Sequence, residues 1–101
     1  MSEKSTEQMI QDKGLNAPRL NPTMIDETIA DEYYHIIPNT TMTICVLTLK
    51  NGFQVTGESA AVSLANFDEE IGRKVARENA REKIWALEGY LLKQKLFEEG
   101  K

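Results

Sequence analysis

Apolar residues recur with two different periods along this chain, and each period predicts a different kind of element. After Asn21, which can cap a helix, Ile25, Ile29 and Tyr33 follow one another at intervals of four residues. That spacing places them on one face of an α-helix. The pattern therefore predicts a short amphipathic helix over about Pro22 to Tyr34.

The next segment, TMTICVLTLKNGFQVTGES, has the pattern of a β-hairpin. Its β-branched runs flank Asn51-Gly52, a dipeptide that tolerates the positive φ angles of a type I′ turn. A two-residue loop would place Thr48 opposite Val55. Neither face of this ribbon is purely polar, and two strands alone are only marginally stable in water. We therefore expect both faces to be covered.

A long helix is predicted after the hairpin. Asn66 followed by Glu69 has the spacing of a capping box, and only Gly72 and Gly89 interrupt the helical pattern before about Glu98. At about 1.5 Å per residue this helix would be roughly 45 Å long, which is more than a hairpin and one short helix can cover. Its distal half, KIWALEGYLLKQKLF, is therefore expected to be an association element.

Together these segments predict an α+β fold with a short N-terminal helix, a two-stranded antiparallel β-hairpin and one long C-terminal α-helix, completed by oligomerisation. Residues 1–20 are polar and are broken by Gly14 and Pro18. We expect them to form an arm that is flexible or ordered by a partner, with one short helical turn over about Glu7 to Lys13. Residues 21–101 form a single small domain, because 101 residues, of which 41% are hydrophobic, can bury one modest core.

The stretch GRKVARENAREKIW gives the predicted long helix two distinct faces. One face is a stripe of small and apolar residues, which at helical spacing is typical of a packing surface. The small residues would allow another backbone to approach closely. The stripe consists of Gly72, Ala76, Ala80, Ile84, Leu87 and Leu91.

The second face carries three arginines four residues apart, Arg73, Arg77 and Arg81, which we call the arginine ridge. One interpretation is a solvated face, in which i,i+4 pairs such as Glu69 with Arg73 contribute only ~0.2–0.5 kcal/mol each. The other is an anion-binding site, because like charges at this spacing are unfavourable by themselves and Trp85 lies on the adjoining flank. Guanidinium groups beside an aromatic ring suit phosphate-bearing, nucleotide-like ligands. The sequence leaves both interpretations open.

Three more residues are candidates to contact the same ligand. Tyr34 could stack on a base or sugar, although a pair of tyrosines at a helix end is also typical of half-buried packing. Glu58 and Asn79 could hydrogen-bond a sugar or base, and Glu58 could instead pair with an arginine of the ridge. The full predicted ligand-binding set is Arg73, Arg77, Arg81, Trp85, Tyr34, Glu58 and Asn79.

Composition and charge argue against several classes of function. The net charge of -4 disfavours binding to double-stranded DNA. Cys45 and His35 are the only cysteine and histidine, which leaves little for acid–base catalysis or a metal site. We therefore expect no enzyme activity, no catalytic or metal site and no cofactor. No stretch approaches the ~18 apolar residues of a membrane span, so we expect a cytoplasmic protein that does not bind the membrane.

Three segments resemble a family of small tailed-bacteriophage proteins named from the forty-ninth and sixty-sixth genes of two enterobacterial phages. They are LTLKNGFQVTGESA, NFDEEIGRKVARENAREKIWALEGYLL and, less specifically, APRLNPTMIDETIADEYY. The likeness covers about residues 17–92. It implies a protein made inside an infected bacterium, and so a location in the host cytoplasm. The resemblance supplies no catalytic residues to carry over.

Two functional hypotheses follow. By analogy with small phage proteins that act by stoichiometric binding, the first is an accessory protein that counters host defence by sequestering an anionic, nucleotide-like signalling molecule. The second is an interaction module that binds and inhibits a host or phage protein through the long helix, with Trp85 and Tyr90 as anchors. In either case we expect the chain to form a homo-oligomer.

Overall fold

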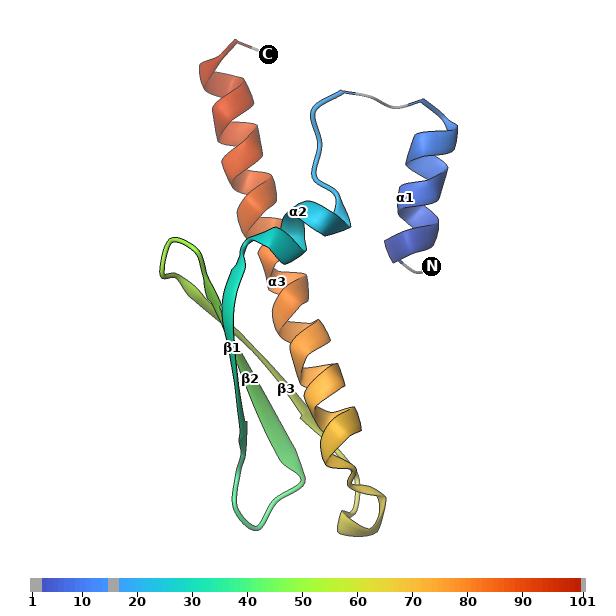
Figure 1. The fold of residues 1–101 in the computed structure, drawn as a ribbon, viewed down its shortest axis with the longest axis vertical. Coiled ribbons are helices and arrows are strands. Elements are labelled where there is room, and N and C mark those ends of the chain that lie inside the picture. Colours follow the sequence, from blue (N-terminus) through green and yellow to red (C-terminus); the bar gives the residue numbers. More distant parts are fainter. Residues whose placement is uncertain (1–2, 15–16, 101) are drawn as a thin grey trace.

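The computed structural model describes residues 3–14 and 17–100, and Figure 1 shows their arrangement. Within these residues, a sheet of three antiparallel strands in the order β1-β2-β3 is crossed on one face by the long helix α3. The molecule measures 53 × 31 × 17 Å along its principal axes. In chain order the elements are α1 (Glu3–Asp12), α2 (Pro22–Glu27), β1 (Ile29–Ile36), β2 (Met42–Leu49), β3 (Gln54–Ala60), the 3-10 helix η1 (Leu64–Asn66) and α3 (Glu69–Glu98).

The predicted two-stranded hairpin is wrong, because a third strand, β1, pairs with β2. The sequence predicts one helix over about Pro22 to Tyr34, whereas α2 ends at Glu27 and the chain continues as a strand. The helix does begin as predicted, with the Asn21 side chain accepting a hydrogen bond from the Met24 amide at 2.9 Å. Past α2, the run YYHII is rich in aromatic and β-branched residues, which favour a pleated, half-buried strand over a helix.

A β-bulge near the start of β1 decides which of its side chains face α3. Ile29 lies opposite Leu49 and Asp31 lies opposite Thr48, so Ala30 is an extra residue in the ladder. Since side chains alternate between the two faces of a strand, the extra residue lets Ile29 share a face with the even-numbered positions that follow. Glu32, Tyr34 and Ile36 thereby lie opposite the buried residues of β2.

The hairpin of β2 and β3 forms, but with a three-residue loop in place of the predicted two-residue type I′ turn. The positive φ angle in this loop is that of Gly52, at 90°, and the Leu49 amide donates to the Phe53 carbonyl at 2.8 Å. These features are those of a type I turn followed by a glycine bulge. The register therefore differs from the prediction by one residue, and Leu47 lies opposite Val55.

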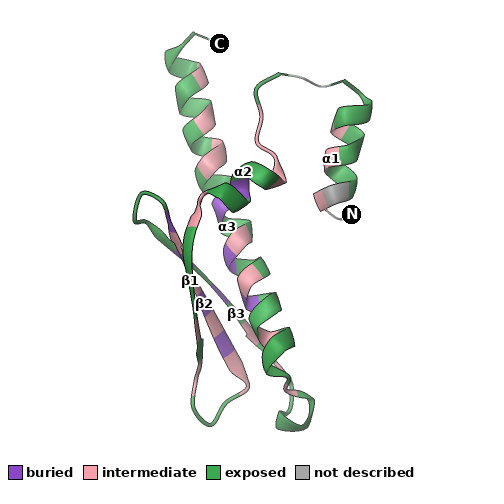
Figure 2. Ribbon diagram, viewed as in Figure 1, coloured by how far each residue is buried: buried purple, intermediate pink, exposed green. Residues whose placement is uncertain are grey.

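The core lies between α3 and one face of the sheet. Alternate residues of β2, from Thr43 to Leu49, are buried, and Figure 2 shows the buried positions on β2 and α3 facing one another. Gly57 on β3 touches the backbone of α3, because a Cβ there would lie 2.2 Å from the Ala80 nitrogen and 2.3 Å from the Ala76 carbonyl oxygen. The small residues of the helix thus form a close-packing seam, as predicted, and its partner is a strand.

Helix α3 ends at Glu98, which confirms the predicted C-terminal limit. Its N-cap differs from the prediction: the Asp68 carboxylate accepts a hydrogen bond from the Ile71 amide at 2.9 Å, while Asn66 belongs to η1. The distal part of the helix extends beyond the sheet (Figure 1). Four large apolar side chains are exposed there, namely Leu87, Tyr90, Leu91 and Phe97.

The N-terminal arm contains more helix than the sequence predicts. Helix α1 spans Glu3–Asp12 in place of a short turn over about Glu7 to Lys13. It stands apart from the sheet and next to α2 (Figure 1). Ion pairs from Glu3 and Glu7 tie it to the rest of the chain.

Candidate functional site

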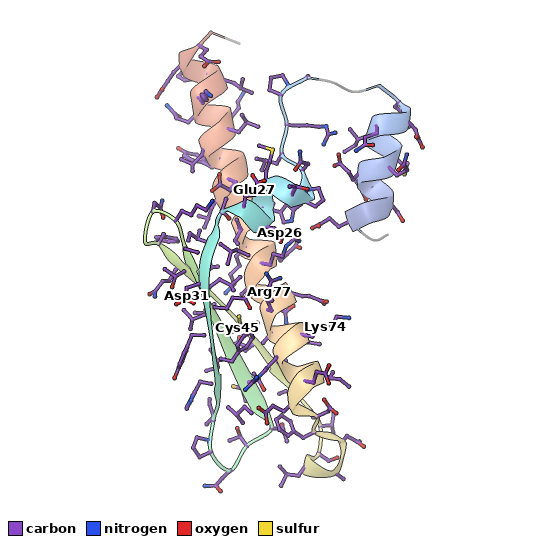
Figure 3. The ribbon with its side chains drawn as sticks, viewed as in Figure 1. Asp26, Glu27, Asp31, Cys45, Lys74 and Arg77 are labelled. Atoms are coloured by element: carbon purple, nitrogen blue, oxygen red, sulfur yellow. The ribbon has the colours of Figure 1, made fainter. Side chains whose placement is uncertain are left out.

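The seven predicted ligand-binding residues separate into two groups on opposite flanks of α3. The arginine ridge and Trp85 contact β1, α2 and α1, and Tyr34 lies among them. Asn79 and Glu58 meet on the flank over β3. Figure 3 shows Arg77 on the side of α3 that faces the sheet, and Lys74 pointing away from the sheet.

Arg77, in the middle of the ridge, is joined to β1. Its Nε donates to Glu32 Oε2 at 2.9 Å, and the Tyr34 hydroxyl donates to Glu32 Oε1 at 2.7 Å. The Tyr34 hydrogen bond and then the Arg77 bond and charge lower the pKa of the Glu32 carboxyl, against the opposing effect of burial. Burial and the bond to Glu32 raise the pKa of Tyr34, so its hydroxyl stays a neutral donor.

Arg81 is the most enclosed arginine of the ridge, with a side chain only 15% exposed. Its Nη1 lies 2.6 Å from Glu3 Oε2, its Nε lies 2.7 Å from Asp26 Oδ1, and its Nη2 donates to the Pro22 carbonyl at 3.2 Å. The hydrogen bond to Glu3 is the largest cause of a raised pKa for this guanidinium, and the bond to Asp26 adds to it. Arg81 thus joins α3 to both α1 and α2.

Trp85 shares one of these carboxylate oxygens with Arg81. Its indole Nε1 donates to Glu3 Oε2 at 3.1 Å, the same oxygen that accepts from Arg81. The rest of the ring packs against the hydrophobic core. We call this pair of donors the Arg81–Trp85 clamp, because together they hold one anionic oxygen.

Arg73 forms the exposed end of the ridge. Its guanidinium lies 5.5 Å from the centroid of the Tyr34 ring, within the range of a cation–π contact. Its Nη2 also pairs with Glu69 at 2.8 Å, which confirms the i,i+4 pair expected from the sequence. The side chain is about half exposed, so this end of the ridge is open to solvent.

The ridge as a whole is an ion-pair network between elements. Arg73, Arg77 and Arg81 each contact at least one carboxylate, which neutralises the like-charge repulsion that made the spacing unusual. The network supplies guanidinium donors, one indole donor and an aromatic ring on a single surface. Chemically, such a surface can bind carboxylate or phosphate oxygens by charge-assisted hydrogen bonds.

Asn79 and Glu58 have a different role from the one the sequence suggested. The Asn79 Nδ2 donates to the Glu58 backbone carbonyl at 2.9 Å, and this bond fastens α3 to β3. The Glu58 residue pairs with Ile44 in the sheet and is exposed, because its position in the strand alternates with the buried Gly57. The two residues are therefore separate from the arginine ridge.

Sequence reasoning missed the carboxylates that complete the ridge, namely Glu3, Asp26 and Glu32. Each is far from its arginine along the chain, by 78, 55 and 45 residues respectively. A signal existed for Glu32, because the alternation of a strand through residues 32, 34 and 36 would have placed it beside Tyr34. Assigning that segment to a helix removed the signal.

A second surface lies where α3 leaves the sheet. A groove of about 310 Å³ runs between the β2–β3 loop and the distal helix. Its lining is mostly apolar and includes Phe53, Leu87, Tyr90 and Leu91, all of which are exposed. This surface has the composition of a protein-contact site.

Within residues 3–14 and 17–100, no helix combines the length and the apolar character that crossing a membrane requires. The same residues contain no cluster of three or more histidine, cysteine, aspartate or glutamate side chains placed to hold a metal ion.

Comparison with known proteins gives one family. Residues 20–96 match the model of the family described as phage protein (N4 Gp49/phage Sf6 gene 66). The match includes the arginine ridge, Trp85, Tyr34 and the distal helix, and leaves α1 outside it. No curated protein and no solved structure matches the chain.

Proposed function

The chain belongs to the N4 Gp49/phage Sf6 gene 66 family of phage proteins, and from this premise we propose that it acts by stoichiometric binding of an anionic, nucleotide-like signalling molecule of host defence. In this proposal the protein works inside the infected bacterium and lowers the free concentration of the messenger. The binding surface is the arginine ridge of α3, with Trp85 and Tyr34 beside it.

The observation that carries the proposal is the Arg81–Trp85 clamp. A guanidinium and an indole N–H converge on one carboxylate oxygen, at 2.6 and 3.1 Å. A phosphate oxygen accepts hydrogen bonds from the same donors. Along the same helix face Arg77 and Arg73 continue the row of positive groups, and the Tyr34 ring offers a surface for stacking.

The ion pairs of the ridge do not prevent an anion from binding there. The carboxylates of Glu3, Asp26 and Glu32 are about one third to one half exposed, so each can move into water when a phosphate takes its place. The exchange keeps every guanidinium paired. Its cost is smallest at the exposed end of the ridge, because a solvent-exposed ion pair contributes typically only about 0.2–1 kcal/mol, and it is larger at Arg81, whose side chain is only 15% exposed.

The test is a binding screen of the full chain with cyclic dinucleotides and ADP-ribose derivatives, followed by thermal unfolding and calorimetry. A ligand present at about 100 times its dissociation constant should stabilise the protein by about 2.7 kcal/mol. Absence of any shift, with protein shown to be folded by circular dichroism, would contradict the proposal.

Variants locate the site once a ligand is found. Arg73→Gln changes the exposed end of the ridge and should leave the fold intact, while lowering affinity roughly tenfold through loss of a charged hydrogen bond. Lys74→Gln makes the same change in net charge one residue away, at a side chain that is 78% exposed and points away from the sheet, and should weaken binding much less. Equal affinity in the two variants would exclude the ridge as the binding surface.

A second candidate function rests on the distal part of α3. The exposed side chains of Leu87, Tyr90 and Leu91 would suit a protein that binds and inhibits a host or phage protein, with Tyr90 as an anchor. Trp85 is not available as the other anchor, since its ring packs on the core. Co-purification should then recover a partner that Tyr90→Ala with Leu91→Ala loses, whereas recovery by this variant would count against the surface.

A further inference from the structure

Helix α1 places one of its own carboxylates in the Arg81–Trp85 clamp. Glu3 Oε2 accepts both the Arg81 and the Trp85 hydrogen bonds. The occupant comes from the segment before residue 20, where the family match begins, while the clamp itself lies inside the match. The chain thus supplies an internal anion to a site whose donors suit an external one.

A second ion pair fastens the same helix at Glu7, about one turn further along. Arg19 holds Glu7 with two parallel hydrogen bonds, from Nη2 to Oε1 at 2.8 Å and from Nη1 to Oε2 at 2.9 Å. The Arg19 bond lowers the pKa of Glu7, so this anchor is ionised at neutral pH. Arg19 lies on the segment between α1 and α2, so this pair steadies α1 while Glu3 reaches the clamp.

The space beneath α1 is a groove and not a packed core. It measures about 310 Å³ and is lined by residues of α1, α2 and α3, including Glu3, Pro22, Glu82 and Trp85. The buried hydrophobic core contains residues of α2, the sheet and α3, with none from α1. Ile10 is the apolar residue of α1 that lines this groove, and it is only half-buried. An element held mainly by polar and charged groups over an open groove can leave without exposing the buried core.

We propose that α1 is a displaceable latch, with Glu3 closing the Arg81–Trp85 clamp until a phosphate group of the ligand competes for the same donors. The latch itself follows from these contacts, and its opening by a phosphate rests on the proposed function. The apparent affinity for the ligand is then reduced by the fraction of molecules in which the clamp is closed. The subsite takes a group with one anionic oxygen that accepts from both donors, and the phosphate or diphosphate of the proposed ligand meets this requirement as the Glu3 carboxylate does.

The latch can be tested without any ligand. Trp85 is the only tryptophan of the chain, so its fluorescence reports directly on the clamp. Glu3→Gln should shift the emission of Trp85 and speed hydrogen exchange of the α1 amides. Glu82→Gln, which removes a neighbouring negative charge that lines the same groove, should do neither. No change in either readout for Glu3→Gln would overturn the latch.

Displacement is tested with pyrophosphate and ADP-ribose as probes. Glu3→Gln should bind both at least about threefold more tightly than wild type, and each probe should speed α1 exchange in the wild-type chain. Glu82→Gln controls for the loss of charge and should change affinity less. Tight binding with unaltered α1 exchange would overturn displacement. If no probe binds either protein, the proposed function fails and the ligand-free measurements still decide the latch.

Discussion

Gly57 is the residue at which the sheet and the long helix are closest. The backbone nitrogen and carbonyl that a Cβ would meet belong to Ala80 and Ala76, and backbone atoms cannot rotate away as a side chain can. The glycine on the strand and the two alanines on the helix are therefore required together for this close contact. This contact fixes the height of α3 over the sheet, and through it the distance from the arginine ridge to β1.

Gly57→Ala should lower the free energy of unfolding by about 1–3 kcal/mol, because the added methyl must push α3 away from β3. Gly89→Ala is the matched control, since a Cβ there lies 3.9 Å from the nearest atom, Leu20 Cδ1. In a helix that change should stabilise the protein by about 0.5–1 kcal/mol. Urea unfolding measures both, and equal effects of the two variants would contradict the close contact.

The Glu32 carboxyl should make the free energy of unfolding depend on pH in the acidic range. Its folded-state pKa lies below the ordinary value of 4.5, so its contribution is complete above about pH 4.5 and is lost as the pH falls through the folded pKa. Glu32→Gln should therefore flatten the decline of unfolding free energy below pH 4.5. Glu58→Gln makes the same charge change on the other face of the sheet. An unaltered decline in Glu32→Gln would rule out the predicted linkage.

At the scale of elements, the sequence identified segments whose signals are local. The long helix ends where its uninterrupted period predicts, and the β2–β3 hairpin follows from its β-branched runs. Strand β1 was missed because Ile25, Ile29 and Tyr33 also fit a helical period, although a boundary at Thr28 divides them. The loop type was missed because Asn51-Gly52 suits both a two-residue and a three-residue loop.

The start of α3 offers a direct test at this scale. Asp68→Ala should cost about 1 kcal/mol in unfolding free energy, because it removes the side-chain hydrogen bond to the Ile71 amide. Asn66→Ala, at the position that the sequence predicted as the cap, should change stability by less than half as much. A larger loss from Asn66→Ala, in thermal or urea unfolding, would contradict the assignment of Asp68.

For the whole molecule, the candidate site was only half predictable. The three arginines of the ridge, Trp85 and Tyr34 share one surface. Helical spacing predicts this for the arginines and Trp85. Glu69 was predicted from its i,i+4 spacing to Arg73, whereas Glu3, Asp26 and Glu32 come from three other elements at long separations in sequence, and a local pattern pointed only to Glu32. Asn79 and Glu58 were grouped with them by chemical type alone, and the crossing of α3 over β3 separates them.

The length of α3 relative to the sheet also governs how the molecule meets others. Tyr90 and Phe97 are 72% and 69% exposed on the part of the helix beyond the sheet. With Leu87 and Leu91 they make four large apolar side chains exposed on one stretch of helix, which is typical of a protein-contact surface. We therefore expect two or more copies of the chain to bury it against one another.

Native mass spectrometry and light scattering should show an oligomer whose dissociation depends on concentration. Tyr90→Glu with Leu91→Glu should shift the population toward monomer, because it places charges in an apolar interface. Lys93→Glu, two residues further along the same helix, changes the net charge by a similar amount and serves as the control. Monomeric wild-type protein at micromolar concentration would contradict self-association through this surface.

The β-bulge at Ala30 sets which residues of β1 face α3. Before the bulge, the odd-numbered Ile29 faces α3. After it, the even-numbered Glu32 and Tyr34 face the arginines of α3. If Ala30 instead joined the ladder as a regular position, every residue after it would switch faces, and Tyr33 and His35 would face α3. Deletion of Ala30, by contrast, would leave a regular strand in which Ile29 and Glu32 still face α3, because each keeps its partner in β2.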